Sequence, residues 1–260
     1  MNGSPLVSVI IPTHNRREQL RVAVQTVLAQ QFRDFEVIVC DDGSTDSTEA
    51  MIRSISDSRI RWLGGPRSGG PAVPRNRGIQ AARGQWYAFL DSDDQWHPQK
   101  LSTQVAVAQR DELRMCCTNA QILRNGKLSI DRYFPPSDDR FLTFRDLLRV
   151  NKVICSSMLV HRAVLRQVGG FPEGREFLAI EDYALWLACS MVDRIRYLSE
   201  PLTIYRDEPK QSLRANAVHR EAVRKRCVLR EVLRRTCRIR RYRTLYQMQL
   251  LAACFFVNRS

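Results

Sequence analysis

Residues 86–96 read WYAFLDSDDQW, in which an apolar run is followed at once by acidic side chains. The run over residues 86–90 is typical of a strand buried on both faces, as in a parallel sheet. Asp91, Asp93 and Asp94 then place three mutually repelling carboxylates at the carboxyl end of that strand. Two physical reasons can account for them. Asp and Ser cap helices and form turns, whereas carboxylates two residues apart can hold a divalent cation that bridges phosphate oxygens.

The chain before this strand repeats the same alternation of strand and helix. Apolar, β-branched runs predict three further strands, over residues 7–11, 35–40 and 59–63. Helical spacing predicts one helix capped by Asn15 and a second that begins near Thr48. The Gly- and Pro-rich residues 64–76 predict an irregular loop, followed by a short helix to Ala82. This alternation indicates an α/β fold with a mostly parallel sheet flanked by helices, whose ligands bind beyond the carboxyl ends of the strands.

The pattern is looser after residue 110. Strands are predicted over residues 113–120, 153–162 and 194–206. A helix is predicted to begin at Glu181, after the turn GGFPEG. Because no Gly occurs after residue 174 and no Pro after residue 209, residues 207–260 are predicted to form a basic helical extension.

The chain is basic, and most of its excess charge lies in this extension. The whole chain has 41 Lys and Arg against 27 Asp and Glu, and 15 against 4 of these fall in residues 206–260, which accounts for +11 of the net +14. A basic amphipathic helix within residues 214–260 suits an anionic membrane surface. The same helix could instead pack on the main domain, or on a second subunit in a homodimer.

Several classes of protein are not expected. Eight cysteines form no C-x-x-C pair and stand mostly in apolar stretches, so we expect reduced thiols, without a zinc site or disulfides. The N-terminus lacks a signal-peptide pattern, and no apolar stretch approaches the roughly 20 residues that span a bilayer. We therefore expect a cytoplasmic protein, at most peripheral on the inner face of the membrane. Specific nucleic-acid binding is not expected, because the basic residues are not interleaved with aromatics and the strand ends are acidic.

A second acidic motif, DDGSTDST over residues 41–48, follows the second predicted strand. An Asp there could accept a hydrogen bond from a base edge or a ribose hydroxyl, or the motif could be only a turn in which Gly43 supplies a positive φ. Two acidic motifs on neighbouring parallel strands together indicate a nucleotide whose diphosphate rests on a metal ion.

Glu181 and Asp182 open the helix that follows the GGFPEG turn. A carboxylate at a helix N-terminus would be kept ionised and could act as a general base on a hydroxyl. Acidic residues in a first helical turn are also common as simple partners of the helix dipole.

The chain resembles the family 2 inverting glycosyltransferases, which have the GT-A fold, a Rossmann-like sheet flanked by helices. The resemblance rests on four segments in the family's order: VSVIIPTHNR (7–16), DFEVIVCDDGSTDST (34–48), PRNRGIQAARGQWYAFLDSDDQWHPQKL (74–101) and VGGFPEGREFLAIEDYALWL (168–187). It implies a glycosyltransferase domain over residues 1–206, with a nucleotide-sugar-binding half (1–118) and an acceptor-binding half (119–206). Residues 207–260 lie outside it.

The resemblance also implies roles for individual residues. Those expected to contact the nucleotide sugar are Pro12, Thr13, His14, Asn15, Asp42, Arg75, Asp91 and Ser92, with Asp42 recognising uracil. Asp93 is the expected principal ligand of Mg²⁺ or Mn²⁺, with Asp91 beside it. Asp182 is the expected catalytic base, which would remove a proton from the acceptor hydroxyl as that hydroxyl displaces the diphosphate.

The implied activity is transfer of a sugar from a UDP-sugar to a hydroxyl of a glycan or polyprenyl-linked acceptor, in cell-surface polysaccharide biosynthesis. Arg206 is a further candidate for the diphosphate, and Trp96 and His97 either border the sugar or belong to the core edge. An inactive scaffold with the same fold is the main alternative, although the retention of Asp42, Asp93 and Asp182 argues against it. A nucleotidyltransferase is disfavoured because PTHNRREQ, after the first strand, has no glycine.

Overall fold

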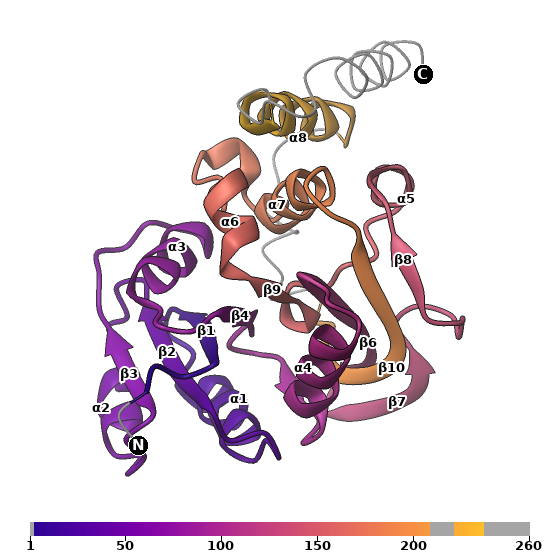
Figure 1. Ribbon diagram of the computed structural model, residues 1–260. Coiled ribbons are helices and arrows are strands. Elements are labelled where there is room, and N and C mark those ends of the chain that lie inside the picture. The colour runs from indigo at the N-terminus through magenta and orange to yellow at the C-terminus, as the bar shows by residue number, and fades with distance from the viewer. Residues whose placement is uncertain (1–2, 209–220, 237–260) are drawn as a thin grey trace.

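The computed structural model describes residues 3–208 and 221–236, with side chains of the second range from Lys225 onward. Figure 1 shows a central sheet with helices on both faces. The strands of the sheet are β1 (Val7–Thr13), β2 (Phe35–Asp41), β3 (Ile60–Leu63), β4 (Trp86–Phe89), β5 (Gln95–Trp96), β6 (Met115–Arg124), β7 (Lys127–Arg132), β8 (Arg140–Leu142), β9 (Leu159–His161) and β10 (Ile195–Arg206). Their order is β3-β2-β1-β4-β9-β6-β10-β5, with β7 paired to β6 and β8 to β10.

Helices cover both faces of the sheet, and α8 lies outside α6 and α7 (Figure 1). They are α1 (Arg17–Leu28), α2 (Thr48–Arg53), α3 (Ala72–Ala81), α4 (Lys100–Arg110), α5 (Phe144–Arg149), α6 (Arg162–Val168), α7 (Glu181–Ser190) and α8 (Glu221–Thr236), with short 3₁₀ turns η1 (Cys155–Ser157) and η2 (Arg175–Phe177). Because side chains alternate along a strand, Val9 and Ile11 of β1 belong to the core shared with α1 and α4 on one face, and Ile10 faces α3 in the core on the other.

The four N-terminal strands are parallel, as the alternation of strand and helix predicted. Beyond β4 the sheet is mixed, because β9 runs antiparallel to both β4 and β6, while β6 and β10 are parallel. The carboxyl ends of β1, β2 and β4 therefore lie at one edge, where the acidic motifs stand. The α/β fold class is confirmed, and the parallel pattern holds chiefly for its first half.

Three local predictions were wrong. Residues 153–162 are not one strand: Ser157 bonds back to the Ile154 carbonyl and forms η1, which leaves only β9 extended. Asn15 does not cap a helix; it has a φ of 49°, and its side-chain oxygen accepts from the Thr45 backbone N–H. The loop predicted over residues 64–76 ends earlier, because α3 begins at Ala72.

Helix α3 tolerates its proline and contacts the sheet closely. Pro74 lies in the first turn, where backbone N–H groups have no partner within a helix, so the missing donor costs little. Gly78 faces the sheet, and a Cβ at this position would lie 2.6 Å from Ile10 Cγ2 and 2.7 Å from Cys40 Sγ. Glycine therefore lets α3 approach β1 and β2 closely enough to bring Arg75 to the strand ends.

The basic extension is helical where the structure describes it. On α8, Val228, Leu229 and Val232 are fully buried and belong to the same core as α7. The predicted helical extension holds for residues 221–236, and the rest of that prediction falls on residues outside the described ranges. Across the described ranges, no helix is both long enough and apolar enough to cross a bilayer.

Candidate active site

A pocket of about 1000 Å³ lies at the carboxyl ends of the parallel strands, opposite the start of α7. It brings together nearly all the site residues that the sequence predicted. Those that line it are Pro12, Thr13, His14, Asp42, Arg75, Asp91, Ser92, Asp93, Asp182 and Arg206. Asn15 does not line it, because its side chain is bound to the loop at Thr45 through two hydrogen bonds.

Asp42 is held in an ionised state by the loop after β3. Its two carboxylate oxygens accept from the Ser68 backbone N–H at 2.8 Å, the Gly69 N–H at 3.1 Å, the Ser68 hydroxyl at 2.5 Å and the Arg67 guanidinium. Burial raises the pKa of Asp42, but the Ser68, Gly69 and Arg67 donors outweigh it and lower the pKa overall. Gly43, with a φ of 72°, leaves no room for a side chain against Arg67, so the turn and this loop meet closely. All four acceptor positions of the Asp42 carboxylate are thus occupied, and a ligand could bind Asp42 only by displacing one of these donors, of which Arg67 is 48% exposed.

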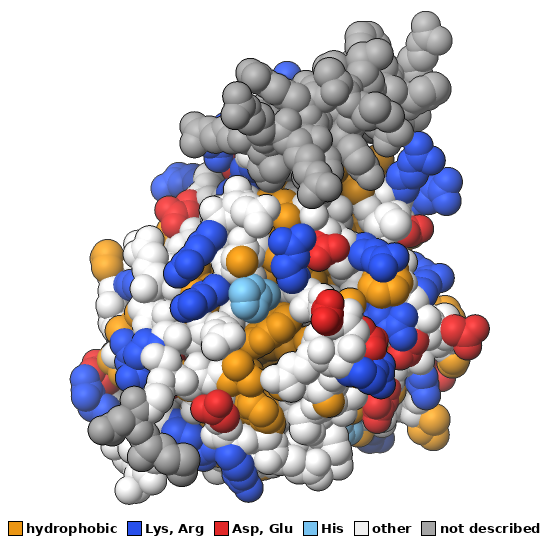
Figure 2. Space-filling view, in the orientation of Figure 1, with side chains coloured by type: hydrophobic (Ala, Val, Ile, Leu, Met, Phe, Trp, Pro, Cys, Tyr) orange, Lys and Arg blue, Asp and Glu red, His pale blue; other side chains and the backbone are white. Residues whose placement is uncertain are grey.

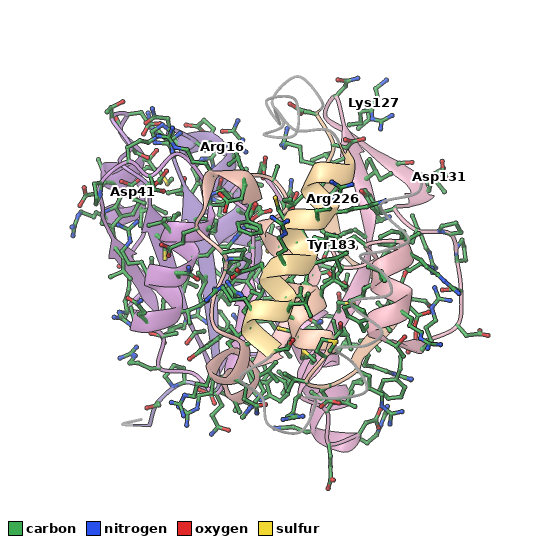
Figure 3. All side chains as sticks on the ribbon, turned by 90° about the horizontal axis from the view of Figure 1, so that it is seen from above. Arg16, Asp41, Lys127, Asp131, Tyr183 and Arg226 are labelled. Carbon is green, nitrogen blue, oxygen red and sulfur yellow. The ribbon has the colours of Figure 1, made fainter. Side chains whose placement is uncertain are left out.

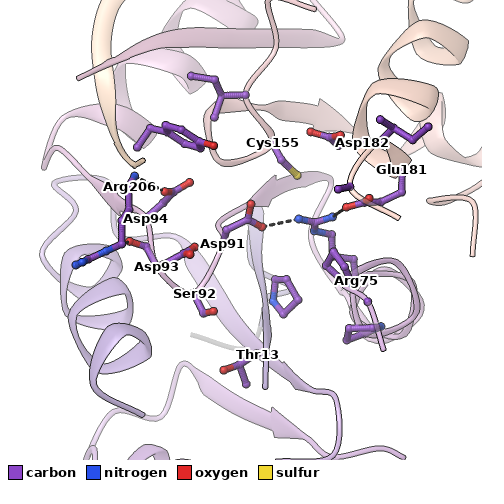
Figure 4. Close-up of a pocket in the computed structure, with 18 of the residues that line it drawn as sticks. Thr13, Arg75, Asp91, Ser92, Asp93, Asp94, Cys155, Glu181, Asp182 and Arg206 are labelled. Atoms are coloured by element: carbon purple, nitrogen blue, oxygen red, sulfur yellow. Dashed lines mark hydrogen bonds and ion pairs between the residues drawn. The ribbon is translucent and has the colours of Figure 1, made fainter. Parts of the chain in front are cut away.

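Arg75 joins the acidic residues after β4 to those at the start of α7. Its guanidinium is buried and donates to Asp91 Oδ1 at 2.5 Å and to Glu181 Oε1 at 2.7 Å (Figure 4). It also lies over the ring of Phe171, 4.9 Å from the centroid. Because Asp91 follows β4 and Glu181 opens α7, this one side chain ties the end of β4 to the start of α7.

Asp93 and Asp94, the other two carboxylates that follow β4, also have partners. Asp93 forms an ion pair with Arg16, and burial raises its pKa while the Arg16 charge opposes that rise. Asp94 is fully enclosed and accepts from the Ser156 hydroxyl at 2.5 Å and from the Arg206 backbone N–H at 2.9 Å. Burial, followed by the charges of Asp93 and Asp91, raises the pKa of Asp94. Asp94 thus positions β10 and η1 rather than a ligand.

The acidic residues fit a metal ion that is shared with a substrate. Within residues 3–208 and 221–236, no three His, Cys, Asp or Glu side chains converge closely enough to hold a metal by themselves. Mg²⁺ commonly uses one or two carboxylates and takes its other ligands from phosphates and water. Asp93 and Asp91 both line the pocket and are about 30% exposed, so they match a cation bound together with a diphosphate.

Asp182 lies on the wall of the pocket formed by the start of α7. Its carboxylate accepts from the Tyr183 backbone N–H at 2.7 Å. Loss of solvent, together with the neighbouring charge of Glu181, raises the pKa of Asp182 to about 7, against the opposing charge of Arg75. The helix N-terminus was expected to favour the ionised form, but desolvation and the charge of Glu181 act against it and raise the pKa. A carboxyl with this pKa can take up a proton near neutral pH.

Trp96 and His97 do not border the pocket. Trp96 is 2% exposed, and its indole N–H donates to the Ser156 carbonyl at 2.7 Å. His97 Nε2 lies 2.7 Å from Gln121 Oε1. Both belong to the packing beneath the site, which decides the alternative that the sequence left open.

Sequence reasoning missed two charged residues that shape the pocket, Arg16 and Arg67, and it missed the role of Glu181 as a partner of Arg75. Arg16 lies one residue after the PTHN segment and Arg67 in the loop after β3, and neither position carries a pattern that would single it out on a chain with 41 basic residues. Glu181 was noted beside Asp182, but nothing in the sequence pairs it with a residue 106 positions earlier.

Several buried polar atoms at the pocket lack a protein partner. Within the described part of the chain, Thr13 Oγ1, His14 Nδ1, Arg75 Nε and Glu181 Oε2 are buried without a hydrogen bond. Buried polar groups are nearly always bonded, so such a group of exceptions at one pocket indicates a place for a polar ligand.

The chain belongs to glycosyl transferase family 2, whose family model matches residues 8–169. The GT-A fold and the assignment as a glycosyltransferase, both implied by the sequence motifs, are thereby confirmed. The chain is 32% identical over 183 residues to the Escherichia coli UDP-Glc:α-D-GlcNAc-diphosphoundecaprenol β-1,3-glucosyltransferase WfgD, covering 70% of this chain and 69% of that protein.

Other relatives and solved structures agree with this assignment. The putative teichuronic acid biosynthesis glycosyltransferase TuaG of Bacillus subtilis is 30% identical, with 79% of this chain and 80% of that protein covered. The crystal structure of S. aureus TarS with UDP-GlcNAc superposes with a TM-score of 0.75 over 96% of this chain and 71% of that one, at 20% identity. The mannosyltransferase PcManGT from Pyrobaculum calidifontis, in complex with GDP-Man and Mn²⁺, gives a TM-score of 0.63 at 19% identity, over 98% and 70% of the two chains.

We predict that Arg75→Met lowers the free energy of unfolding by about 3 kcal/mol, because it leaves the buried Glu181 carboxylate and the partly exposed Asp91 carboxylate without their cation. Arg67→Met is the matched control: Arg67 is 48% exposed and Asp42 keeps its other donors, so the expected loss is at most about 1 kcal/mol. Guanidinium denaturation followed by circular dichroism measures both. Equal losses in the two variants would contradict the central role of Arg75.

Proposed function

We propose that the chain is an inverting, metal-dependent glycosyltransferase that moves a sugar from a UDP-sugar to a hydroxyl of a glycan or lipid-linked acceptor. The observation that carries the proposal is the meeting of Asp42, the Asp91–Asp93 pair and Asp182 around one pocket. Each of these carboxylates suits a different part of such a reaction.

Asp42 supports a nucleotide with a ring N–H. Its oxygens are fixed in position and ionised, and a uracil edge could donate to them by taking the place of the Arg67 guanidinium, which is 48% exposed. Thr13 and His14 stand beside it, each with a buried polar atom that a nucleotide could satisfy. We assign this end of the pocket to the uridine of the donor.

Asp93 and Asp91 would hold Mg²⁺ or Mn²⁺ together with the donor diphosphate. The cation, when bound, supplies positive charge that stabilises the diphosphate as it leaves. Arg206 lines the same part of the pocket, anchored by its backbone N–H to Asp94, so its guanidinium can also face the leaving phosphates.

Asp182 is proposed to take the proton of the acceptor hydroxyl. A base with a pKa of about 7 is partly ionised at neutral pH and still strong enough to accept that proton. The hydroxyl would form its bond to the anomeric carbon as the bond to the diphosphate breaks, from the opposite side, which inverts the configuration.

A covalent sugar–protein intermediate is not needed and has little support here. Cys155 is the thiol that lines the pocket, and burial raises its pKa well above the ordinary range despite the nearby charge of Arg75. A protonated thiol is a poor nucleophile. A thiol-bound sugar intermediate is therefore disfavoured.

The acceptor is proposed to be a glycan carried on a polyprenyl diphosphate, in cell-surface polysaccharide synthesis. Relatives over 30% identical carry names that refer to diphosphoundecaprenol acceptors. The part of the pocket formed by residues after 119 has an aromatic wall, in which the rings of Tyr133 and Tyr205 lie 5.1 Å apart. Aromatic faces of this kind pack well against sugar rings.

An inactive scaffold and a nucleic-acid-binding protein are weaker proposals. The charged residues of the motifs converge on one pocket, which a scaffold would not need. On the face shown in Figure 2, Lys and Arg side chains are spread among acidic and uncharged ones rather than gathered along one track.

We predict that UDP binds more tightly with Mn²⁺ than without it, and that Asp93→Ala removes the difference. Isothermal titration of UDP, with and without Mn²⁺, measures this directly. Asp111→Ala, which changes an exposed-surface carboxylate paired only with Arg110, should keep the parent's behaviour. If UDP binds under neither condition, the donor assignment is wrong.

We predict that Asp182→Asn lowers kcat by about a thousandfold, since it removes the proposed base. In the parent chain kcat should rise with pH through about 7, because only the deprotonated carboxylate can take a proton and its pKa lies there. The variant's residual rate should lack this limb. A parent profile that is flat from pH 5.5 to 8.5 would argue against Asp182 as the base.

We further propose that the enzyme is peripheral on the cytoplasmic face of the membrane through the basic extension. The apolar side of α8 is buried on α7, so it is not free to enter a bilayer, but Arg226 and Arg230 are exposed on its outer side. Figure 3 views the molecule from the side on which α8 lies and shows Arg226 there. A homodimer that uses this surface is the other partner proposed for it.

Sedimentation with phosphatidylglycerol vesicles tests the membrane proposal. We expect binding at low salt that Arg226→Glu with Arg230→Glu weakens at least about tenfold. The control carries the same charge change on distant exposed residues, Arg53→Glu with Arg110→Glu. Equal binding by both double variants would overturn the role of α8, and a change in oligomeric state instead would favour the homodimer.

A further inference from the structure

Arg235 reaches from α8 into the main domain, although it lies beyond the residues that the family model matches. Its side chain is 9% exposed. The guanidinium donates through Nη1 to the Val168 carbonyl at 3.1 Å and to the Gly170 carbonyl, and through Nε to Glu231 Oε1 at 2.6 Å. Hydrogen bonds from Arg234, then from Arg235, lower the pKa of Glu231 to about 2 against its burial, so Glu231 stays ionised and fixes the guanidinium.

The carbonyls that Arg235 binds belong to a segment with little freedom. Val168 is the last residue of α6, whose terminal carbonyls have no partner within the helix. Gly169 follows with a φ of 85°, and Gly170 has no room for a side chain, since a Cβ would lie 2.2 Å from Asn76 Oδ1. Residues 168–170 are therefore held between Arg235, which binds two of their carbonyls, and Asn76, which packs against Gly170.

Asn76 holds the next residue of this segment, Phe171. Its amide group donates to the Phe171 carbonyl at 2.8 Å and accepts from the Phe171 N–H at 2.7 Å. The Phe171 ring then lies beneath Arg75, 4.9 Å from the guanidinium carbon, and packs edge-on against Phe89 and Trp186. The position of the Arg75 guanidinium therefore depends on where residues 169–171 lie.

We propose that Arg235 is a positioning residue for the active site: by binding the carbonyls at residues 168 and 170, it holds Phe171 beneath Arg75 and so fixes Arg75 between Asp91 and Glu181. The catalytic consequence of this linkage rests on the proposed function. On this view α8 contributes to the geometry of the active site.

A purely stabilising role for Arg235 makes a different prediction. If Arg235 only holds α8 in place, its loss reduces the fraction of folded protein and leaves the chemistry of the folded fraction unchanged. If it positions Arg75, its loss weakens the positive charge near Asp182. The charged groups that face Asp182 are Glu181, Arg75 and Asp91, and of these only Arg75 favours the ionised carboxylate.

The test compares Arg235→Met with Arg234→Met, which removes a neighbouring arginine that is 62% exposed and also bonded to Glu231. Arg235→Lys, which keeps the charge and one donor group, is the conservative variant. Hydrogen exchange measured by mass spectrometry should show faster exchange over residues 169–178 in Arg235→Met and parent-like exchange in Arg234→Met. Partial recovery is expected in Arg235→Lys.

The kinetic arm uses the folded variants with a UDP-sugar donor. Arg235→Met should lower kcat about tenfold and move the rising limb of the pH–rate profile to higher pH, because a misplaced Arg75 no longer favours ionised Asp182. Arg234→Met should leave both unchanged. A lower rate with an unmoved limb, or unchanged exchange over residues 169–178, overturns the proposal. If the parent transfers no sugar, the proposed function fails, and the exchange result alone decides whether Arg235 controls this segment.

Discussion

The buried guanidinium of Arg75 is the interaction on which the arrangement of the pocket depends. An enclosed cation is costly unless anions meet it, and here Asp91 comes from the end of β4 and Glu181 from the start of α7. The ion pairs therefore constrain two elements that are distant in sequence to a fixed separation. Asp182, next to Glu181, is held opposite the Asp91–Asp93 pair for the same reason.

The crowded carboxylates of WYAFLDSDDQW are compatible with folding because each has its own partner. Arg75 pairs with Asp91, Arg16 with Asp93, and the backbone N–H of Arg206 binds Asp94. The partners come from three different parts of the chain. Their attraction to the carboxylates offsets the repulsion between the carboxylates themselves. Asp91 and Asp93 remain at the pocket surface, where a cation and a diphosphate could bind them.

Helix α8 illustrates how a basic amphipathic segment divides its roles. Its apolar side completes the core beside α7, and its outer arginines remain in solvent. Composition alone could not separate these uses, because a membrane surface, a second subunit and the chain's own core all select the same pattern. The contacts of Val228 and Leu229 decide for the core over residues 225–236.

The sequence by itself determined the α/β class, the strands of the first half and most of the acidic residues that gather at the pocket, because burial imposes a period on apolar residues and short motifs mark strand ends. Tertiary structure alone decided which charges meet: the pairing of Arg75 with Glu181 spans 106 positions, and that of Arg16 with Asp93 spans 77. Tertiary structure also raised the pKa of Asp182 through burial and the nearby charge of Glu181, whereas a helix N-terminus alone would lower it. Such effects depend on distance and solvent exclusion, which the order of residues along a chain does not contain.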